Sequence, residues 1–205
     1  MAQPLQILTS LPMPLIIDNV DTDQIIPSRE MKSTGKTGLA DGLFAGWRYS
    51  EIGGRTPNRD FILNDPHYAN SKIILGGANF GCGSSREHAV WAIAEYGFRA
   101  VIAPSFAPIF AGNCIRNGVL PAVLDADNIA TIRSSQNPVT IDLRAQTIAI
   151  GPDQNWSFPL EDEAKAMLLE GLDAIDLSLK MADQITHWQK ADHADRPWIY
   201  LGANP

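Results

Sequence analysis

Short apolar runs alternate with amphipathic stretches through the first 124 residues of the chain. The apolar runs are predicted to be buried strands, and they lie at residues 15–17, 73–75, 99–103 and 119–124. Apolar side chains recur at helical spacing over residues 89–96, which Gly97 ends, and over residues 104–115, which Gly118 ends. This order of strands and helices predicts right-handed crossovers and a parallel sheet.

The pattern changes in the last third of the chain. Residues 139–143 alternate between apolar and polar side chains and residues 146–150 repeat the alternation, which predicts a β-hairpin; residues 156–158 add a strand. Helices are predicted at residues 161–172 and 182–190, and we expect the aromatic tail at 191–205 to dock on another surface. No repeat or domain boundary is evident, so we predict a single domain over residues 1–205 with a C-terminal helical extension.

Two polar segments interrupt the regular pattern. Residues 18–23 carry three aspartates, which we interpret as a turn because no further metal ligands follow at a recognisable spacing. Residues 31–57 are rich in glycine, with a local cluster of Phe44, Trp47 and Tyr49 and one short helix predicted at 39–47. A segment of this length with little regular structure is either functional or a surface excursion held by its aromatic residues.

The candidate chemistry lies in residues 76–89, which read Gly-Gly-Ala-Asn-Phe-Gly-Cys-Gly-Ser-Ser-Arg-Glu-His-Ala. The glycines permit a tight turn and close approach of a ligand to the backbone. We predict that Ser84 or Ser85 caps the helix that follows and that Arg86 lies in its first turn. Free N–H groups at a helix start, together with a planar guanidinium, favour a carboxylate or phosphate.

The same residues have a structural interpretation. Glycine-rich turns between a strand and a helix are common, and a serine at a helix start is ordinary capping. No lysine precedes the serines as in a Walker A loop, and the Gly-x-Gly-x-x-Gly spacing is absent, so neither nucleotide-binding motif is present. Cys82 is interpreted as a small buried thiol.

Composition limits the possible partners and compartments. The chain is 45% hydrophobic and 19% charged with a net charge of −7, which favours an ordinary folded core and argues against a nucleic-acid surface. Two cysteines suit a reducing compartment and cannot supply the full thiolate ligation of an iron–sulfur cluster. No apolar run approaches the ~20 residues of a membrane span, and no signal-peptide pattern is present, so we expect a cytoplasmic protein without membrane contact.

Four motifs in order resemble those of one known family. Residues 82–89 are joined by Ala-Pro-Ser-Phe-Ala-Pro-Ile-Phe at 103–110, Asn-Gly-Val-Leu-Pro at 117–121 and Asn-Val-Asp-Thr-Asp-Gln-Ile-Ile-Pro at 19–27. Together they resemble the swivel domain of the aconitase superfamily and, within it, the small subunits of 3-isopropylmalate dehydratase. The resemblance implies a single α/β domain of the β/β/α swivelling type.

The resemblance also implies a reaction and its residues. The expected enzyme is a hydro-lyase of leucine biosynthesis that isomerises isopropylmalate by dehydration and rehydration, with Ser84 as the base and Asp23 beside it. Ser85 and Arg86 are expected to bind the dicarboxylate substrate. The chain is expected to hold no metal or cofactor, because the [4Fe–4S] cluster belongs to the large-subunit partner, without which this chain is inactive.

The family implies that residues 31–57 sense the variable group of the substrate. Leu39 and Leu43 are predicted to form an apolar wall if this segment closes over the site. Two alternatives remain open at this stage. The chain resembles small subunits that act on homoaconitate or citraconate as well, and a carboxylate-binding module without catalysis would carry the same anion site.

Overall fold

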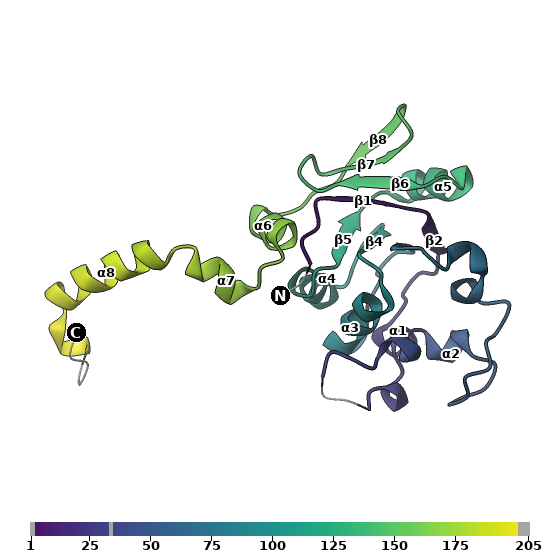
Figure 1. Ribbon diagram of the computed structural model, residues 1–205, viewed down its shortest axis with the longest axis horizontal. Helices are drawn as coiled ribbons and strands as arrows, with labels where there is room; N and C mark the ends of the chain where they lie inside the picture. Colours follow the sequence, from purple (N-terminus) through teal and green to yellow (C-terminus); the bar gives the residue numbers. More distant parts are fainter. Residues whose placement is uncertain (1–2, 33–34, 201–205) are drawn as a thin grey trace.

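The computed structural model describes residues 3–32 and 35–200. The predictions for the 1–205 domain, the 31–57 segment and the 191–205 tail therefore include residues outside this description, namely 1–2, 33–34 and 201–205. Figure 1 shows a body of two sheets with helices beside them, and a C-terminal part that runs away from this body.

Four parallel strands form the central layer of the body, in the order β2-β3-β4-β5. Their bounds are β2 Pro12–Leu15, β3 Ile73–Gly76, β4 Ala100–Ala103 and β5 Leu120–Val123. Every residue of β3 and β4 is buried, as expected for strands covered on both faces. The parallel sheet predicted from the alternation of strands and helices is confirmed.

A second sheet is antiparallel, in the order β1-β6-β7-β8. Its strands are β1 Ile7–Ser10, β6 Val139–Asp142, β7 Thr147–Ile150 and β8 Gln154–Ser157. The predicted hairpin is confirmed, with Ile141 opposite Ile148, and β8 extends it. The sequence did not predict β1, which pairs with β6 across more than 130 residues of chain: Thr9 Oγ1 and Thr140 Oγ1 are 2.9 Å apart.

Helices connect and cover these strands. The α-helices are α1 Thr22–Ile25, α2 Ala45–Arg48, α3 Glu87–Tyr96, α4 Pro108–Arg116, α5 Ala126–Ser135, α6 Asp162–Glu170, α7 Ala174–Leu179 and α8 Ala182–Asp195. Short 3₁₀ turns are η1 Ser28–Glu30, η2 Ala40–Gly42, η3 Ile62–Asn64, η4 Pro66–Tyr68 and η5 Pro197–Ile199. Within the described ranges, no helix combines the length and apolarity needed to cross a membrane.

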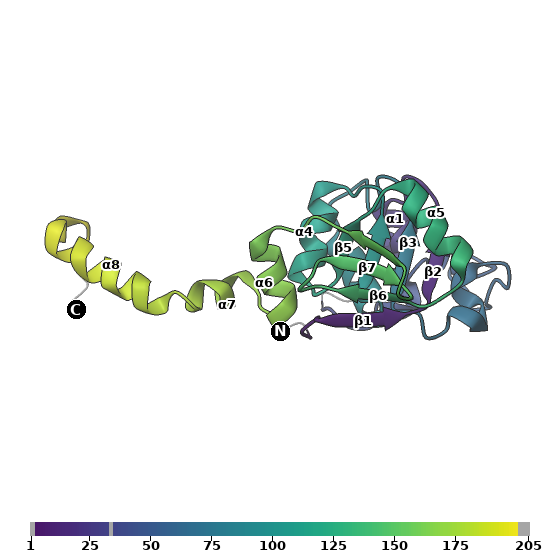
Figure 2. The same cartoon turned by 90° about the horizontal axis from the view of Figure 1, so that it is seen from above.

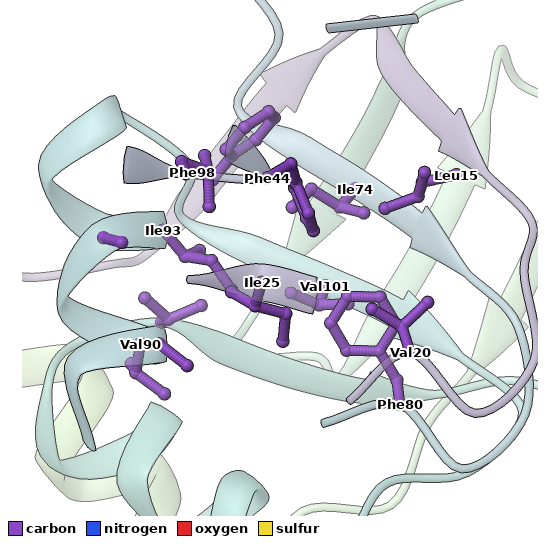
Figure 3. Packing of buried hydrophobic residues seen from close by; sticks show 14 of the residues in the cluster. Leu15, Val20, Ile25, Phe44, Ile74, Phe80, Val90, Ile93, Phe98 and Val101 are labelled. Carbon is purple, nitrogen blue, oxygen red and sulfur yellow. The ribbon is translucent and has the colours of Figure 1, made fainter. Parts of the chain in front are cut away.

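Alternation along the parallel strands separates two cores. Ile74 and Val101 belong to a cluster with the helices α1 and α3, and Figure 3 shows them packed with Ile25, Val90 and Ile93. The neighbouring positions Ile73, Leu75, Ala100 and Ile102 belong to a cluster with the antiparallel sheet. The parallel sheet is therefore the middle layer of a β/β/α sandwich, as the resemblance predicted.

The first strand lies earlier than predicted. Residues 15–17 were predicted to form it because they are an apolar run, but β2 ends at Leu15 and contains both Pro12 and Pro14. A proline removes one backbone donor, which an edge strand tolerates because only one of its sides is paired. β2 is at the edge of its sheet and pairs only with β3.

Two predicted helices differ from those observed. The helix predicted over 39–47 is divided into η2 and α2, because Phe44 takes a φ of 50° while its N–H donates to Ile25 O at 2.7 Å. The helix predicted to start at residue 104 begins at Pro108. Residues 105–107 instead pair with Phe80, so their backbone is not free to be helical.

Candidate active site

The glycine-rich turn after β3 passes too close to its neighbours for larger residues. A Cβ on Gly77 would lie 2.4 Å from the backbone carbonyl of Ile17. Gly81 has a φ of +77°, and a Cβ there would lie 2.1 Å from the ring of Phe110. Both the conformation and the packing of this turn therefore require glycine.

The turn pairs with the segment 18–22, which comes from about 60 residues earlier in the chain. Gly81 N donates to Val20 O at 2.7 Å, and Thr22 N donates to Cys82 O at 3.0 Å. The Thr22 hydroxyl donates to the carbonyl of Ser84 at 2.8 Å. These bonds fix the backbone of Ser84 relative to the start of α1. The part played by Thr22 was not predictable from the sequence, because neither its residue type nor its position indicates this bond.

Helix α1 replaces the plain turn predicted at residues 18–23. The Asp21 carboxylate accepts from Gln24 N at 2.7 Å, and Asp21 N donates to Gln24 Oε1 at 2.8 Å, which makes a capping box. The Asp-x-x-Gln pattern was a signal for this short helix that the sequence analysis missed. Its consequence is that Asp23 has a fixed place in the first turn of α1.

Asp23 and Arg86 form an ion pair at the junction of α1 and α3. The side chain of Asp23 is 55% exposed and that of Arg86 only 23%. The close polar contact with Arg86 holds the pKa of Asp23 below its usual value, assisted by Ser28 Oγ, which donates to Asp23 Oδ1 at 3.3 Å. Arg86 Nη1 is buried, and in the described structure it makes no well-directed hydrogen bond. Asp23 thus compensates the charge of the partly buried guanidinium through this same nitrogen.

Ser84 and Ser85 precede the helix rather than cap it. Arg86 is the N-cap of α3, and no side chain accepts a hydrogen bond at this cap. The prediction that a serine caps the helix was therefore wrong. Helix α3 begins at Glu87, so the N-cap position belongs to Arg86 and both serines lie before it. Both serines are exposed, and neither hydroxyl has a hydrogen-bond partner among the described residues. The structure brings together Ser84, Ser85, Arg86 and Asp23.

Leu39 and Leu43 lie elsewhere. Both are fully buried in the core cluster that includes Phe44, and so they form part of the packing beneath the segment. Their role as an apolar wall for substrate remains a prediction, and their burial favours a packing role in this chain.

Two carboxylates hold the segment that contains these leucines. Glu95 on α3 accepts from the backbone N–H groups of Gly38, Leu39 and Ala40 at 2.5–2.9 Å. Burial acts to raise the pKa of Glu95, but the three amide donors outweigh it and hold the pKa below its usual value. Glu30, whose side chain is 5% exposed, accepts from Arg55 Nη2 at 2.6 Å.

The cysteines do not form a metal site. Cys114 is fully buried in the core, which raises the pKa of its thiol, and Cys82 is half-buried with its thiol donating to Asn19 O at 3.3 Å. The interpretation of Cys82 as a buried thiol holds only in part. Among residues 3–32 and 35–200, no group of three or more potential ligands is arranged to hold a metal ion.

Comparison with known proteins defines the class to which this fold and site belong. A family model described as the aconitase C-terminal domain matches residues 2–127, which is more than half of the chain. The chain belongs to this family of α/β swivel domains.

Individual relatives narrow the assignment. The 3-isopropylmalate dehydratase small subunit of Cupriavidus necator is 50% identical over 92% of this chain and 93% of its own length. The small subunit of Rhizobium meliloti is 47% identical over 93% of this chain and 96% of its own length. The crystal structure of 3-isopropylmalate dehydratase from Methanocaldococcus jannaschii matches with a TM-score of 0.64 and 31% identity, over 89% of this chain and 99% of that one. Within the family, the chain belongs with the 3-isopropylmalate dehydratase small subunits, whose name implies a large-subunit partner.

The capping geometry predicts different effects of two substitutions on stability. Ser84→Ala is expected to change the free energy of unfolding by less than about 0.5 kcal/mol, because the hydroxyl makes no hydrogen bond. Asp21→Ala is expected to cost ~1 kcal/mol, because it removes the cap of α1, and Asp21→Asn should restore most of that loss. Urea unfolding of the three variants measures these changes. A loss of 1 kcal/mol or more in Ser84→Ala would show that Ser84 caps α3.

Proposed function

We propose that this chain is the small subunit of a 3-isopropylmalate dehydratase, which interconverts 2- and 3-isopropylmalate by dehydration and rehydration in leucine biosynthesis. The observation that carries the proposal is the cluster of two unbonded hydroxyls and a partly buried arginine at the junction of α1 and α3. Its setting in a chain 45–50% identical to named small subunits supports this choice of substrate.

Ser84 is assigned the role of base. The reaction removes a proton from the carbon next to a carboxylate, so it needs a proton acceptor and a way to hold negative charge. A serine hydroxyl is a very weak acid, and its deprotonated form needs positive charge and donors nearby. The start of α3 and the Arg86 guanidinium lie next to Ser84 in the chain and are suited to that task.

Arg86 and Ser85 are assigned to the substrate. A guanidinium presents two parallel donors to a carboxylate, and the contact of Arg86 with Asp23 is made through Nη1. The lowered pKa keeps Asp23 ionised at neutral pH, so it acts as a counter-ion that orients Arg86 and not as a proton donor. The exposed hydroxyl of Ser85 can hydrogen-bond the substrate.

The iron–sulfur cluster of the family does not fit this chain. Such clusters take four thiolate ligands as a rule, whereas here one of two cysteines is sealed in the core and the other donates to a backbone carbonyl. We therefore assign the [4Fe–4S] cluster to the large subunit, with the substrate held between the two chains. Free thiols and the biosynthetic role support a cytoplasmic location.

Reconstitution tests the function. The isolated chain is expected to be colourless and inactive, and addition of its large subunit is expected to give conversion of 2-isopropylmalate, followed by absorbance of the unsaturated intermediate. Ser84→Ala should assemble normally and lose turnover, while Ser135→Ala should retain it, because the Ser135 hydroxyl donates to Ile132 O within helix α5. Conversion of homoaconitate or citraconate alone would assign the chain to another hydro-lyase, and near-normal kcat in Ser84→Ala would place the base elsewhere.

Arg86→Lys is expected to lower kcat/KM roughly 10- to 150-fold, which corresponds to the ~1.5–3 kcal/mol of a charged hydrogen bond. Both KM and kcat should change, because the planar fork becomes a point charge. Arg144→Lys, in the turn between β6 and β7, is the matched control and should leave both constants unchanged. Steady-state kinetics of the assembled enzyme measures this. Equal effects of the two variants on kcat/KM would show that Arg86 does not bind the substrate.

The two leucines offer a test of the substrate-sensing segment. Under the apolar-wall prediction, Leu43→Ala narrows the preference for isopropylmalate over a shorter-chain malate by up to a hundred-fold, since a methylene is worth ~1–3 kcal/mol. Under a packing role, it lowers stability by ~2–5 kcal/mol and leaves the preference unchanged. The ratio of kcat/KM values and the urea midpoint separate these outcomes. An unchanged ratio would assign specificity to the large subunit.

A further inference from the structure

The C-terminal arm, residues 173–200, has no covering surface. Figures 1 and 2 show α7 and α8 running away from both sheets in two perpendicular views. None of the residues of either helix is buried. A helix of 14 residues is marginal in water without packing, so the arm requires a second surface to be stably helical.

Apolar side chains are concentrated on this arm. It holds 28 of the 196 described residues but 7 of their 13 exposed large hydrophobic side chains, so the concentration is not an average property of the surface. Met181, Ile185 and Trp188 follow one another at spacings of four and three, which places them on one face of α8. Ile175 and Leu179 form a similar pair on α7.

The end of the arm is fixed in a hook. Tyr200 Oη donates to Asp192 Oδ2 at 2.5 Å, and Arg196 pairs with the same carboxylate. This contact turns η5 back against α8 and leaves Trp198 66% exposed. The large apolar side chain at the hook is therefore held outward by polar bonds instead of collapsing onto its own helix.

We propose that the arm is the docking segment for the large subunit and lies in an apolar groove on that partner; the inference rests on the proposed function. Pairing of two α8 helices would bury three large side chains of each arm, Ile185 and Trp188 on the helix and Met181 at its N-cap. Even if each of the three buried the ~200 Å² of a tryptophan, the total of ~600 Å² would be less than the ~800 Å² that each partner of a stable complex buries. Burial of all seven side chains needs a surface that follows α7, α8 and η5, which a folded partner can supply.

The relatives support this choice of partner. Their alignments cover 92–94% of the chain, so they extend into the arm even if every unmatched residue lies at the C-terminus. The arm is thus shared by proteins that are all named as small subunits.

Binding of full-length variants to the purified large subunit tests the proposal. Trp188→Ala is expected to raise the Kd at least ten-fold by calorimetry, as for a central aromatic contact. His187→Ala, the exposed neighbour outside the apolar face, should stay within two-fold. Alanine favours helix more than tryptophan or histidine does, so circular dichroism should show no loss of helix in either variant. The isolated wild-type chain is expected to sediment as a monomer.

Three outcomes would overturn the inference. An unchanged Kd in both Trp188→Ala and Ile185→Ser would show that the arm does not dock. A wild-type dimer that Trp188→Ala dissociates, with unchanged affinity for the large subunit, would make a second copy the occupant. Failure of the wild-type chain to bind the large subunit at all would reject the proposed function together with the inference. An active complex whose Kd does not change when the arm is substituted would reject the inference alone.

Discussion

The pairing of residues 18–22 with the turn at 78–84 is the contact on which the candidate site depends. Backbone N–H and C=O groups of the two segments bond to each other, from Asn19 N to Ala78 O at one end to Thr22 N to Cys82 O at the other. The hydrogen bond from the Thr22 hydroxyl to the Ser84 carbonyl extends this pairing and connects the start of α1 to the residues just before α3. Asp23 and Arg86 meet only because these two helix starts are held together in this way.

Beneath the turn, Phe80 provides the fixed point. Its ring is fully buried, contacts Phe106 and Phe110 edge-on, and occupies the space that a Cβ on Gly76 would need. Figure 3 shows the ring next to Val20 and below the parallel sheet. The exposed serines thus follow a turn whose backbone is held in place by a buried aromatic ring.

Much of this arrangement was predictable from local sequence. The buried strands at Ile73 and Ala100, the hairpin at Ile141 and Ile148, and the end of α3 at Gly97 follow from periodicity and glycine chemistry. Three of the misses share a cause, because tertiary contacts decided the local structure there. β1 exists through its pairing with β6, Phe44 is left-handed because its amide bonds to Ile25, and Ser105 is extended because it pairs with Phe80. Helices α5 and α7 were not predicted, although each follows an aspartate that caps it, Asp125 and Asp173, and such a residue is a local signal of a helix start. The grouping of Ser84 with Arg86 was visible in the sequence, whereas the part played by Thr22 and Ser28 was not.

The bonds from Glu95 have a consequence for how this family can change. The carboxylate binds backbone amides, and those amides are present whichever side chains occupy positions 39 and 40. At residues 38–40 the backbone is therefore held by one residue in a neighbouring helix, through groups that every side chain leaves available. Side chains along it can be exchanged during evolution without remaking the contact that orders it. Point substitutions at exposed positions of the segment can then accumulate while the fold that presents the segment stays the same.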